Sequence, residues 1–259
     1  MDGRVPQPGS RPVVLVTGVG RTAGIGAACA VALAAAGWDV AVSWWSGYDA
    51  RMPWGADPDG VPGVERAVVD AGGRFVAVEA DLERPGTPSE LVDTVTTALG
   101  PVTALVLSHC ESVDSDLRST TVESFDRHMA VNARATWLLV KEHAERFAGP
   151  FGTGRVVALT SDHTAHNLPY GASKGAMDRI VLAAARELAD LGVTANVVNP
   201  GPTQTGWMDD ALVARVVGQT PLGRLGRPED AARLVTFLCS DAGGWVNGQL
   251  LCSDGGINA

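Results

Sequence analysis

Cysteine is scarce in this chain of 259 residues, and its few thiols are widely spaced. The four cysteines, Cys29, Cys110, Cys239 and Cys252, include no C-x-x-C pair. Disulfide-stapled scaffolds and structural zinc sites both rely on clustered cysteines. Neither class fits the sequence, and we expect no metal site.

Long apolar runs are also absent. No stretch reaches the ~18 apolar residues that a membrane-spanning helix needs, and the alanine-rich segment 26–37 is too short. The first residues are polar and rich in proline and glycine, without the apolar centre of a signal peptide. We expect residues 1–11 to form a flexible tail, and the protein to be cytoplasmic and to bind no membrane.

Positive charge is in deficit. The chain has 29 acidic and 20 basic residues, a formal net charge of −9 and a pI near 5.0. Such a surface repels nucleic acid and anionic membranes, so we expect neither as a partner. A small molecule is the expected ligand.

Short apolar segments alternate with longer segments of helical character along the whole chain. The strand-like segments end in glycine or polar residues, and several helix-like segments close on a glycine. The predicted strands are 12–18, 39–45, 74–82, 102–108, 154–161, 193–201 and 248–256, and the predicted helices are 24–37, 91–100, 122–147, 170–192 and 228–240.

This alternation predicts an α/β fold. The predicted strands lack a polar face, which favours a seven-stranded parallel sheet covered by helices on both sides. The architecture is that of a single doubly wound, Rossmann-type domain over residues 12–259. The Gly-, Pro- and Trp-rich segment 46–63 is long for a connection, and we interpret it as either a functional flap or an ordered decoration.

A glycine-rich turn, "TGVGRTAGIG" (17–26), lies between the first predicted strand and the first predicted helix. Gly18, Gly24 and Gly26 would allow a tight turn in which the backbone approaches a pyrophosphate at the helix N-terminus. The alternative is a turn that merely joins a strand to a helix. Its position in the fold favours dinucleotide binding.

The choice of coenzyme depends on the end of the second strand, which is "SWWS" (43–46). An acidic residue at this place binds the ribose 2′-hydroxyl of NAD, and none is present. Arg21, inside the glycine-rich turn, is a candidate ligand for a 2′-phosphate, and Arg51 is a weaker one. Trp44 is a candidate for stacking on adenine, with packing as its alternative role. We therefore favour NADP(H) over NAD(H).

Tyr170 and Lys174 stand four residues apart in "YGASK", at the start of a predicted helix. Residues at this spacing share a helix face, so both side chains would point towards the ends of the strands. A nearby ammonium and the positive nicotinamide lower the pKa of a phenol. A decrease of ~3 units corresponds to roughly 4 kcal/mol and would make Tyr170 an acid/base at neutral pH. The alternative is an exposed helix pair without a chemical role.

Together these motifs resemble the short-chain dehydrogenase/reductase family, most closely its 3-oxoacyl-carrier-protein reductases. The resemblance runs from residue 12 to the end of the chain. It depends on the glycine-rich turn, "ADL" (80–82), "VNARATW" (131–137), "YGASK" (170–174), "NPGPTQT" (199–205) and the segment 221–256. The order of these motifs is highly specific, whereas each alone is not.

The resemblance implies hydride transfer between a nicotinamide coenzyme and a carbonyl or alcohol, by a homotetramer or homodimer. The implied catalytic residues are Asn132 (holding a water chain), Ser161 (polarising the carbonyl), Tyr170 (acid/base) and Lys174 (binding the nicotinamide ribose). The implied coenzyme contacts are Gly18, Gly24, Ile25, Gly26, Asp81, Leu82, Ser108, Tyr170, Lys174, Pro200, Gly201 and Thr205.

Three departures from the family pattern keep alternatives open. Five residues separate Gly18 from Gly24 where the family usually has three, which is similar to the enoyl-reductase branch that reduces C=C bonds. The segment "LSHC" (107–110) replaces the usual "NNAG". Ser161 precedes Tyr170 by only nine residues, so Thr160 is the alternative hydroxyl. A non-catalytic dinucleotide sensor on the same fold is the third hypothesis.

Overall fold

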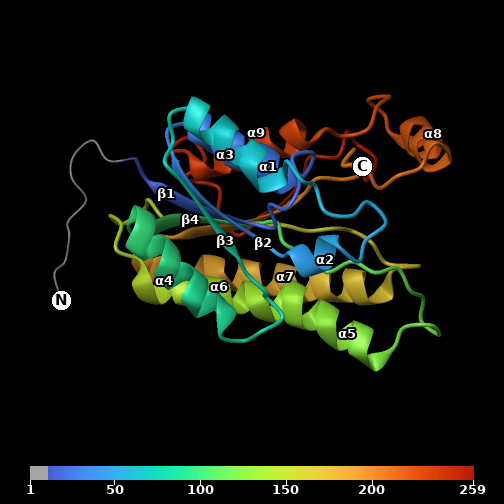
Figure 1. The fold of residues 1–259 in the computed structure, drawn as a ribbon, viewed down its shortest axis with the longest axis horizontal. Coiled ribbons are helices and arrows are strands. Elements are labelled where there is room, and N and C mark those ends of the chain that lie inside the picture. Colours follow the sequence, from blue (N-terminus) through green and yellow to red (C-terminus); the bar gives the residue numbers. More distant parts are fainter. Residues whose placement is uncertain (1–10) are drawn as a thin grey trace.

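The structure is a computed structural model that describes residues 11–259 (Figure 1). The expected flexible tail therefore lies outside the described residues, apart from Arg11. Seven parallel strands form one sheet in the order β3-β2-β1-β4-β5-β6-β7. The strands are β1 (Val13–Thr17), β2 (Asp39–Trp44), β3 (Phe75–Glu79), β4 (Val102–Leu107), β5 (Arg155–Leu159), β6 (Thr194–Asn199) and β7 (Leu250–Cys252). This is the predicted doubly wound Rossmann-type sheet.

Helices cover both faces of the sheet (Figure 1). The helices are α1 (Ile25–Ala35), α2 (Ser46–Asp49), α3 (Gly60–Asp70), α4 (Thr87–Leu99), α5 (Val122–His128), α6 (Ala135–Arg146), α7 (Leu168–Glu187), α8 (Asp210–Gln219) and α9 (Pro228–Cys239). One layer contains α1, α3 and α9, and the other contains α4, α6 and α7. Among residues 11–259, no helix has the length and apolarity needed to cross a membrane.

Two hydrophobic cores follow from this layering. Strands β1, β5 and β6 are buried along their whole length, so their side chains enter both cores in alternation. Leu15 and Leu105 pack under the α4–α6–α7 layer, whereas Val14 and Val106 pack under the α1–α3–α9 layer. The continuous apolar runs in the sequence arise because both faces of the sheet are covered.

Four helical elements differ from the sequence prediction: α2, α3 and α8 were not predicted, and one predicted helix is interrupted. The predicted helix 122–147 is interrupted by one wider π-helical turn, η1 (Met129–Arg134), between α5 and α6. The segment 46–63, expected to be irregular, contains α2 and the first residues of α3. Helix α3 was missed because Pro62 and Gly63 weaken its helical signal, although proline is tolerated in a first helical turn.

Candidate active site

The predicted site lies at one edge of the sheet, where the parallel strands end. Thr17, the last residue of β1, is in register with Ser43 of β2 and Leu107 of β4, so these strands end at the same level. Lys174 of α7 reaches this edge, since its Nζ donates to the carbonyl oxygen of Leu159, the last residue of β5, at 2.7 Å. In doubly wound sheets, ligands bind at this edge.

The glycine-rich turn has the shape that a dinucleotide requires. Gly18 has a φ of 76°, and a Cβ there would lie 2.6 Å from the backbone of His109, so only glycine fits. Helix α1 then begins at Ile25 without a side-chain cap and without an acidic residue in its first turn. Its first N–H groups are therefore suited to an anion such as a pyrophosphate.

The segment 107–110, which replaces "NNAG", packs against the glycine-rich turn and is held by hydrogen bonds. Thr17 Oγ1 lies 2.7 Å from Nδ1 of His109, and the Nε2 of that histidine lies 3.1 Å from the carbonyl oxygen of Val131. Burial, with a smaller contribution from the charge of Lys174, lowers the pKa of His109 to about 3. His109 is therefore a neutral residue with a structural role. Burial also raises the pKa of the Cys110 thiol, which makes it a poor nucleophile.

Asn132 is fully buried in the π-helical turn, and its side-chain amide makes three hydrogen bonds. Its Oδ1 accepts from the backbone N of Glu111 at 2.7 Å, and its Nδ2 donates to the carbonyl oxygen of Glu111 and to Ser173 Oγ, each at 2.8 Å. Both amide protons are thus used within the protein. The side chain joins the loop after β4 to α7, and the holding of a water chain by Asn132 stays a prediction.

Tyr170 and Lys174 share one face of α7, as their spacing predicts. The Lys174 Nζ lies 5.8 Å from the centre of the Tyr170 ring, and the lysine is only 2% exposed. Burial lowers the pKa of Lys174. The exposed-pair alternative is therefore wrong.

The protein groups alone raise the pKa of Tyr170, whereas the predicted decrease also depends on the positive nicotinamide. Burial raises it above its ordinary value, and the charge of Cys110 raises it further, whereas hydrogen bonding by Ser161 opposes part of this increase. Lys174 does not reverse the effect, because its ammonium is held at the Leu159 carbonyl. The chain by itself thus keeps the phenol protonated, which suits a proton donor.

The structure distinguishes between the two candidate hydroxyls. Ser161 is half-buried next to Tyr170, and its Oγ accepts from the backbone N of His163 at 3.2 Å. Thr160 is 5% exposed, and its Oγ1 has no hydrogen-bond partner among the described residues. Ser161 therefore fits the predicted role better than Thr160.

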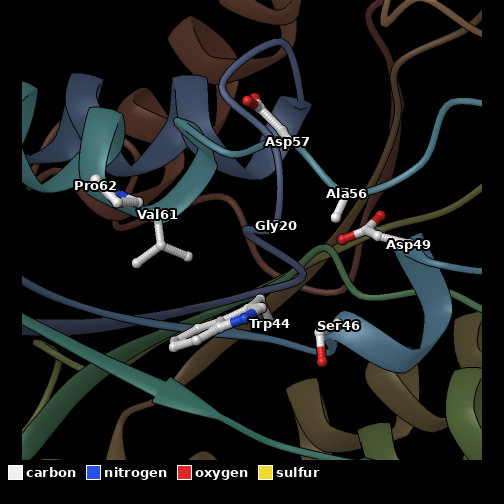
Figure 2. A pocket seen from close by; sticks show the side chains of 8 residues that line it. All are labelled: Gly20, Trp44, Ser46, Asp49, Ala56, Asp57, Val61 and Pro62. Carbon is white, nitrogen blue, oxygen red and sulfur yellow. The ribbon is translucent and has the colours of Figure 1, made fainter.

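A pocket of about 210 Å³ opens beside the glycine-rich turn, at the end of β2 (Figure 2). Its lining residues are Gly20, Trp44, Ser46, Asp49, Ala56, Asp57, Val61 and Pro62. The Trp44 indole lies along one side of this space, which fits a contact with an adenine ring. Arg21 lies close by, but its guanidinium is directed to the Trp54 ring, 4.7 Å from the ring centre.

Comparison with known proteins identifies the family. A sequence model described as "Enoyl-(Acyl carrier protein) reductase" matches residues 18–258. A solved short-chain dehydrogenase from Burkholderia cenocepacia, in complex with NADP, is 31% identical with a TM-score of 0.84, and the match covers 97% of this chain and 98% of that one. The chain belongs to the short-chain dehydrogenase/reductase family.

Two curated relatives extend the comparison. This short-chain dehydrogenase/reductase is 32% identical to the Bacillus subtilis "Uncharacterized oxidoreductase YjdA" over 95% of the chain and 96% of the relative. It is also 32% identical to an Arabidopsis thaliana "NADPH-dependent aldehyde reductase-like protein, chloroplastic", over 97% of the chain and 96% of the relative. The protein is thus an oxidoreductase of a family that binds nicotinamide coenzymes.

The other predicted coenzyme contacts of this dehydrogenase/reductase lie in the loops that come after strands β3, β4 and β6. Asp81 and Ser108 are half-buried after β3 and β4, and Thr205 is half-buried after β6. Leu82 differs, because its side chain is 6% exposed and packs in the core. The remaining two predicted contacts beyond β6 are Pro200 and Gly201, both half-buried.

The structure gives Arg51 a different partner and adds Glu111 and Tyr48, which sequence reasoning missed. Arg51, a weak candidate for binding a 2′-phosphate, instead pairs with the buried Glu111. Tyr48 places its Oη 3.5 Å from the carbonyl oxygen of Ser112, in the loop after β4. No motif signals these contacts, because they join the segment 46–63 to a loop about 60 residues away in sequence.

Proposed function

We propose that this protein reduces carbonyl groups, or oxidises the matching alcohols, with Tyr170 as the acid/base. The observation that carries the proposal is the pair of the half-buried Tyr170 and the buried Lys174 at the ends of the strands, next to a glycine-rich turn that suits a dinucleotide. When bound, the nicotinamide coenzyme supplies or takes up the hydride. The protein supplies the proton and the geometry.

Each side chain has a physical task. Tyr170, kept protonated by burial, donates its proton to the carbonyl oxygen as the adjacent carbon is reduced. Ser161 donates a hydrogen bond to the same oxygen and stabilises the charge that develops on it. Lys174 donates to the Leu159 carbonyl and has further N–H groups for the ribose hydroxyls. Asn132 fixes α7 through Ser173.

The preferred coenzyme is NADP(H). No acidic residue ends β2, Arg21 lies beside the pocket, and the names of two relatives given above mention NADP or NADPH. Asp49 and Asp57 lie close to Arg21 and offset part of its charge. We therefore expect NADPH to bind about tenfold more tightly than NADH, about 1.4 kcal/mol. Arg21→Ala should remove this difference.

Reduction of a C=C bond is the second candidate, favoured by the lengthened glycine-rich turn and by the description of the matching family. The spacing of four residues between Tyr170 and Lys174 favours the carbonyl reaction. Self-association as a homotetramer or homodimer is also part of the proposal, because Val122 and Phe125 on α5 and Trp137 on α6 are exposed apolar residues. Light scattering after size exclusion tests it, with a monomer as the contrary result.

The decisive experiment measures NADPH oxidation with a panel of aldehydes, ketones and a 2-enoyl thioester, together with NADPH binding by fluorescence. Tyr170→Phe should lose nearly all carbonyl reduction while keeping its affinity for NADPH. Lys174→Met should lose turnover, whereas Lys141→Met, which alters an exposed lysine paired with Glu145, should not. Wild-type turnover by Tyr170→Phe, or binding of NADPH without any reduction by the wild type, would contradict the proposal.

A further inference from the structure

Residues 46–63, called the insertion below, are attached at one end to the glycine-rich turn. Thr22 donates from its backbone N and its Oγ1 to the Asp57 carboxylate, at 3.0 and 2.8 Å. A Cβ on Gly60 would lie 2.1 Å from the carbonyl oxygen of Gly20, so the two backbones are in direct contact. The insertion therefore packs against the turn that the coenzyme must approach.

The other end of the insertion is anchored in the loop after β4. Arg51 forms an ion pair with Glu111, whose side chain is 3% exposed, whereas that of Arg51 is 36% exposed. Loss of Arg51 would leave a buried carboxylate without its partner, which is strongly unfavourable. The pair therefore holds the insertion against this loop more firmly than a surface ion pair would.

Glu111 connects this anchor to the catalytic residues. Both backbone groups of Glu111 are bound by the Asn132 amide, which also donates to Ser173 Oγ. The Ser173 hydroxyl in turn donates to the carbonyl oxygen of Tyr170 at 2.9 Å. A continuous path of contacts thus runs from Arg51 to the helix turn that carries the acid/base.

Tyr48 brings a second phenol to the same site. Its ring lies 5.4 Å from the Arg51 guanidinium, and its Oη approaches the Ser112 carbonyl. Burial raises the pKa of Tyr48, and the charges of Cys110, Glu111 and Tyr170 raise it further, which places the phenol among these groups. Tyr48 and Tyr170 are the two tyrosines of the chain, and both therefore lie at the same site.

We propose that the insertion forms one wall of the substrate site, with Tyr48 as a specificity-determining residue and Arg51 as a positioning residue that acts on Asn132 through Glu111. The proposal rests on the proposed function for its substrate class, a carbonyl compound. The placement of the insertion can be tested without any turnover.

The first experiment uses Cys110 as a reporter, in a Cys252→Ser background that removes the exposed thiol. The reaction rate with 5,5′-dithiobis(2-nitrobenzoate) is measured, and mass spectrometry counts the modified thiols. Arg51→Gln should release the insertion and accelerate modification of Cys110 at least tenfold, with Cys29 and Cys239 unmodified. Arg51→Lys should restore most of the protection. The matched control, Arg66→Gln, removes an ion pair to Asp59 in which both side chains are exposed, and should change nothing.

The second experiment measures kcat and KM. Arg51→Gln and Glu111→Gln should each lower kcat about tenfold, or about 1.4 kcal/mol in barrier, with little change in the Kd for NADPH. Their double variant should be no worse than either single variant, because the pair acts as a unit. Tyr48→Ala should shift the ratio of kcat/KM for 2-naphthaldehyde over propanal about tenfold towards the larger aldehyde.

Unchanged Cys110 reactivity in Arg51→Gln would overturn the anchoring role, whatever the enzyme reduces. An unchanged aldehyde ratio in Tyr48→Ala would overturn the specificity role. If Cys110 becomes reactive as expected but the wild type reduces no carbonyl compound, the proposed function fails while the placement of the insertion stands.

Discussion

Replacing His143 by leucine should stabilise the protein and reduce the dependence of its stability on pH. His143 lies on α6 with 1% of its surface exposed, and neither ring nitrogen has a hydrogen-bond partner in the described part of the chain. Burial lowers its pKa from 6.5 to about 4. The folded chain therefore keeps the ring neutral at pH values where the unfolded chain binds a proton.

The sign and size of the effect follow from proton linkage. Protonation of the unfolded chain favours unfolding, so stability that is fully present above pH 6.5 is lost as the pH falls towards the folded value. With a pKa of 6.5 unfolded and about 4 folded, His143 should cost about 1.2 kcal/mol between pH 7 and 5.5. Removing two unpartnered ring nitrogens should also add about 1 kcal/mol at pH 7.5.

The predicted effect of His143→Leu is tested by urea unfolding, followed by tryptophan fluorescence. The free energy of unfolding is measured at pH 7.5 and 5.5, both above the pI near 5.0. Between these two pH values the wild type should lose more stability than His143→Leu, by about 1.3 kcal/mol. His109, with a pKa of about 3, contributes to the slope in both proteins and cancels in the comparison. The control is His163→Gln, which replaces an exposed histidine. Equal losses in wild type and His143→Leu would show that the buried ring accepts a proton in the folded chain.

Three further predictions concern the site. Gly18→Ala should lower the free energy of unfolding in urea by several kcal/mol and abolish NADPH binding, because Gly18 has a φ of 76° and an added Cβ would lie 2.6 Å from the His109 backbone. Gly37→Ala is the control: Gly37 has a φ of 97° but open space around it, so the loss should be only about 1 kcal/mol. Asn132→Ala should lower the free energy of unfolding by roughly 3 kcal/mol, since three buried hydrogen bonds are lost; a loss under 1 kcal/mol would contradict the assigned network. Ser161→Ala should lower kcat about 100-fold, and Thr160→Val should not; the reverse result in steady-state assays would exchange their roles.

The strand pattern and the Tyr170–Lys174 pair were predictable, because both depend on short-range spacing. A buried parallel sheet produces continuous apolar runs, and a four-residue spacing fixes a shared helix face. The interruption of helix 122–147 was not predictable, because it accompanies the bonding of Asn132 to a loop about 20 residues earlier. The contribution of the protein groups to the pKa of Tyr170 was also not predictable, because burial and the position of Lys174 are tertiary properties.

The role of the segment 46–63 could not be predicted from the sequence either. Its composition indicated a flap or a decoration, but the pairing of Arg51 with Glu111 depends on two loops that the fold brings together. Arg51 looked like a phosphate ligand because cations near the end of the second strand often have that role. A buried carboxylate in the loop after β4 is the stronger partner, and only the tertiary structure reveals it.

The contact between Gly20 and Gly60 has a consequence for protein engineering. A side chain on Gly60 would displace the Gly20 backbone, and a side chain on Gly20 would collide with the Asp49 carboxylate. The glycine-rich turn and residues 46–63 therefore have to be exchanged together. Grafting residues 46–63 onto a relative with a shorter first turn would create a steric mismatch unless residues 18–24 were transferred with them. Chimeras that carry both pieces should fold, and those that carry one should not.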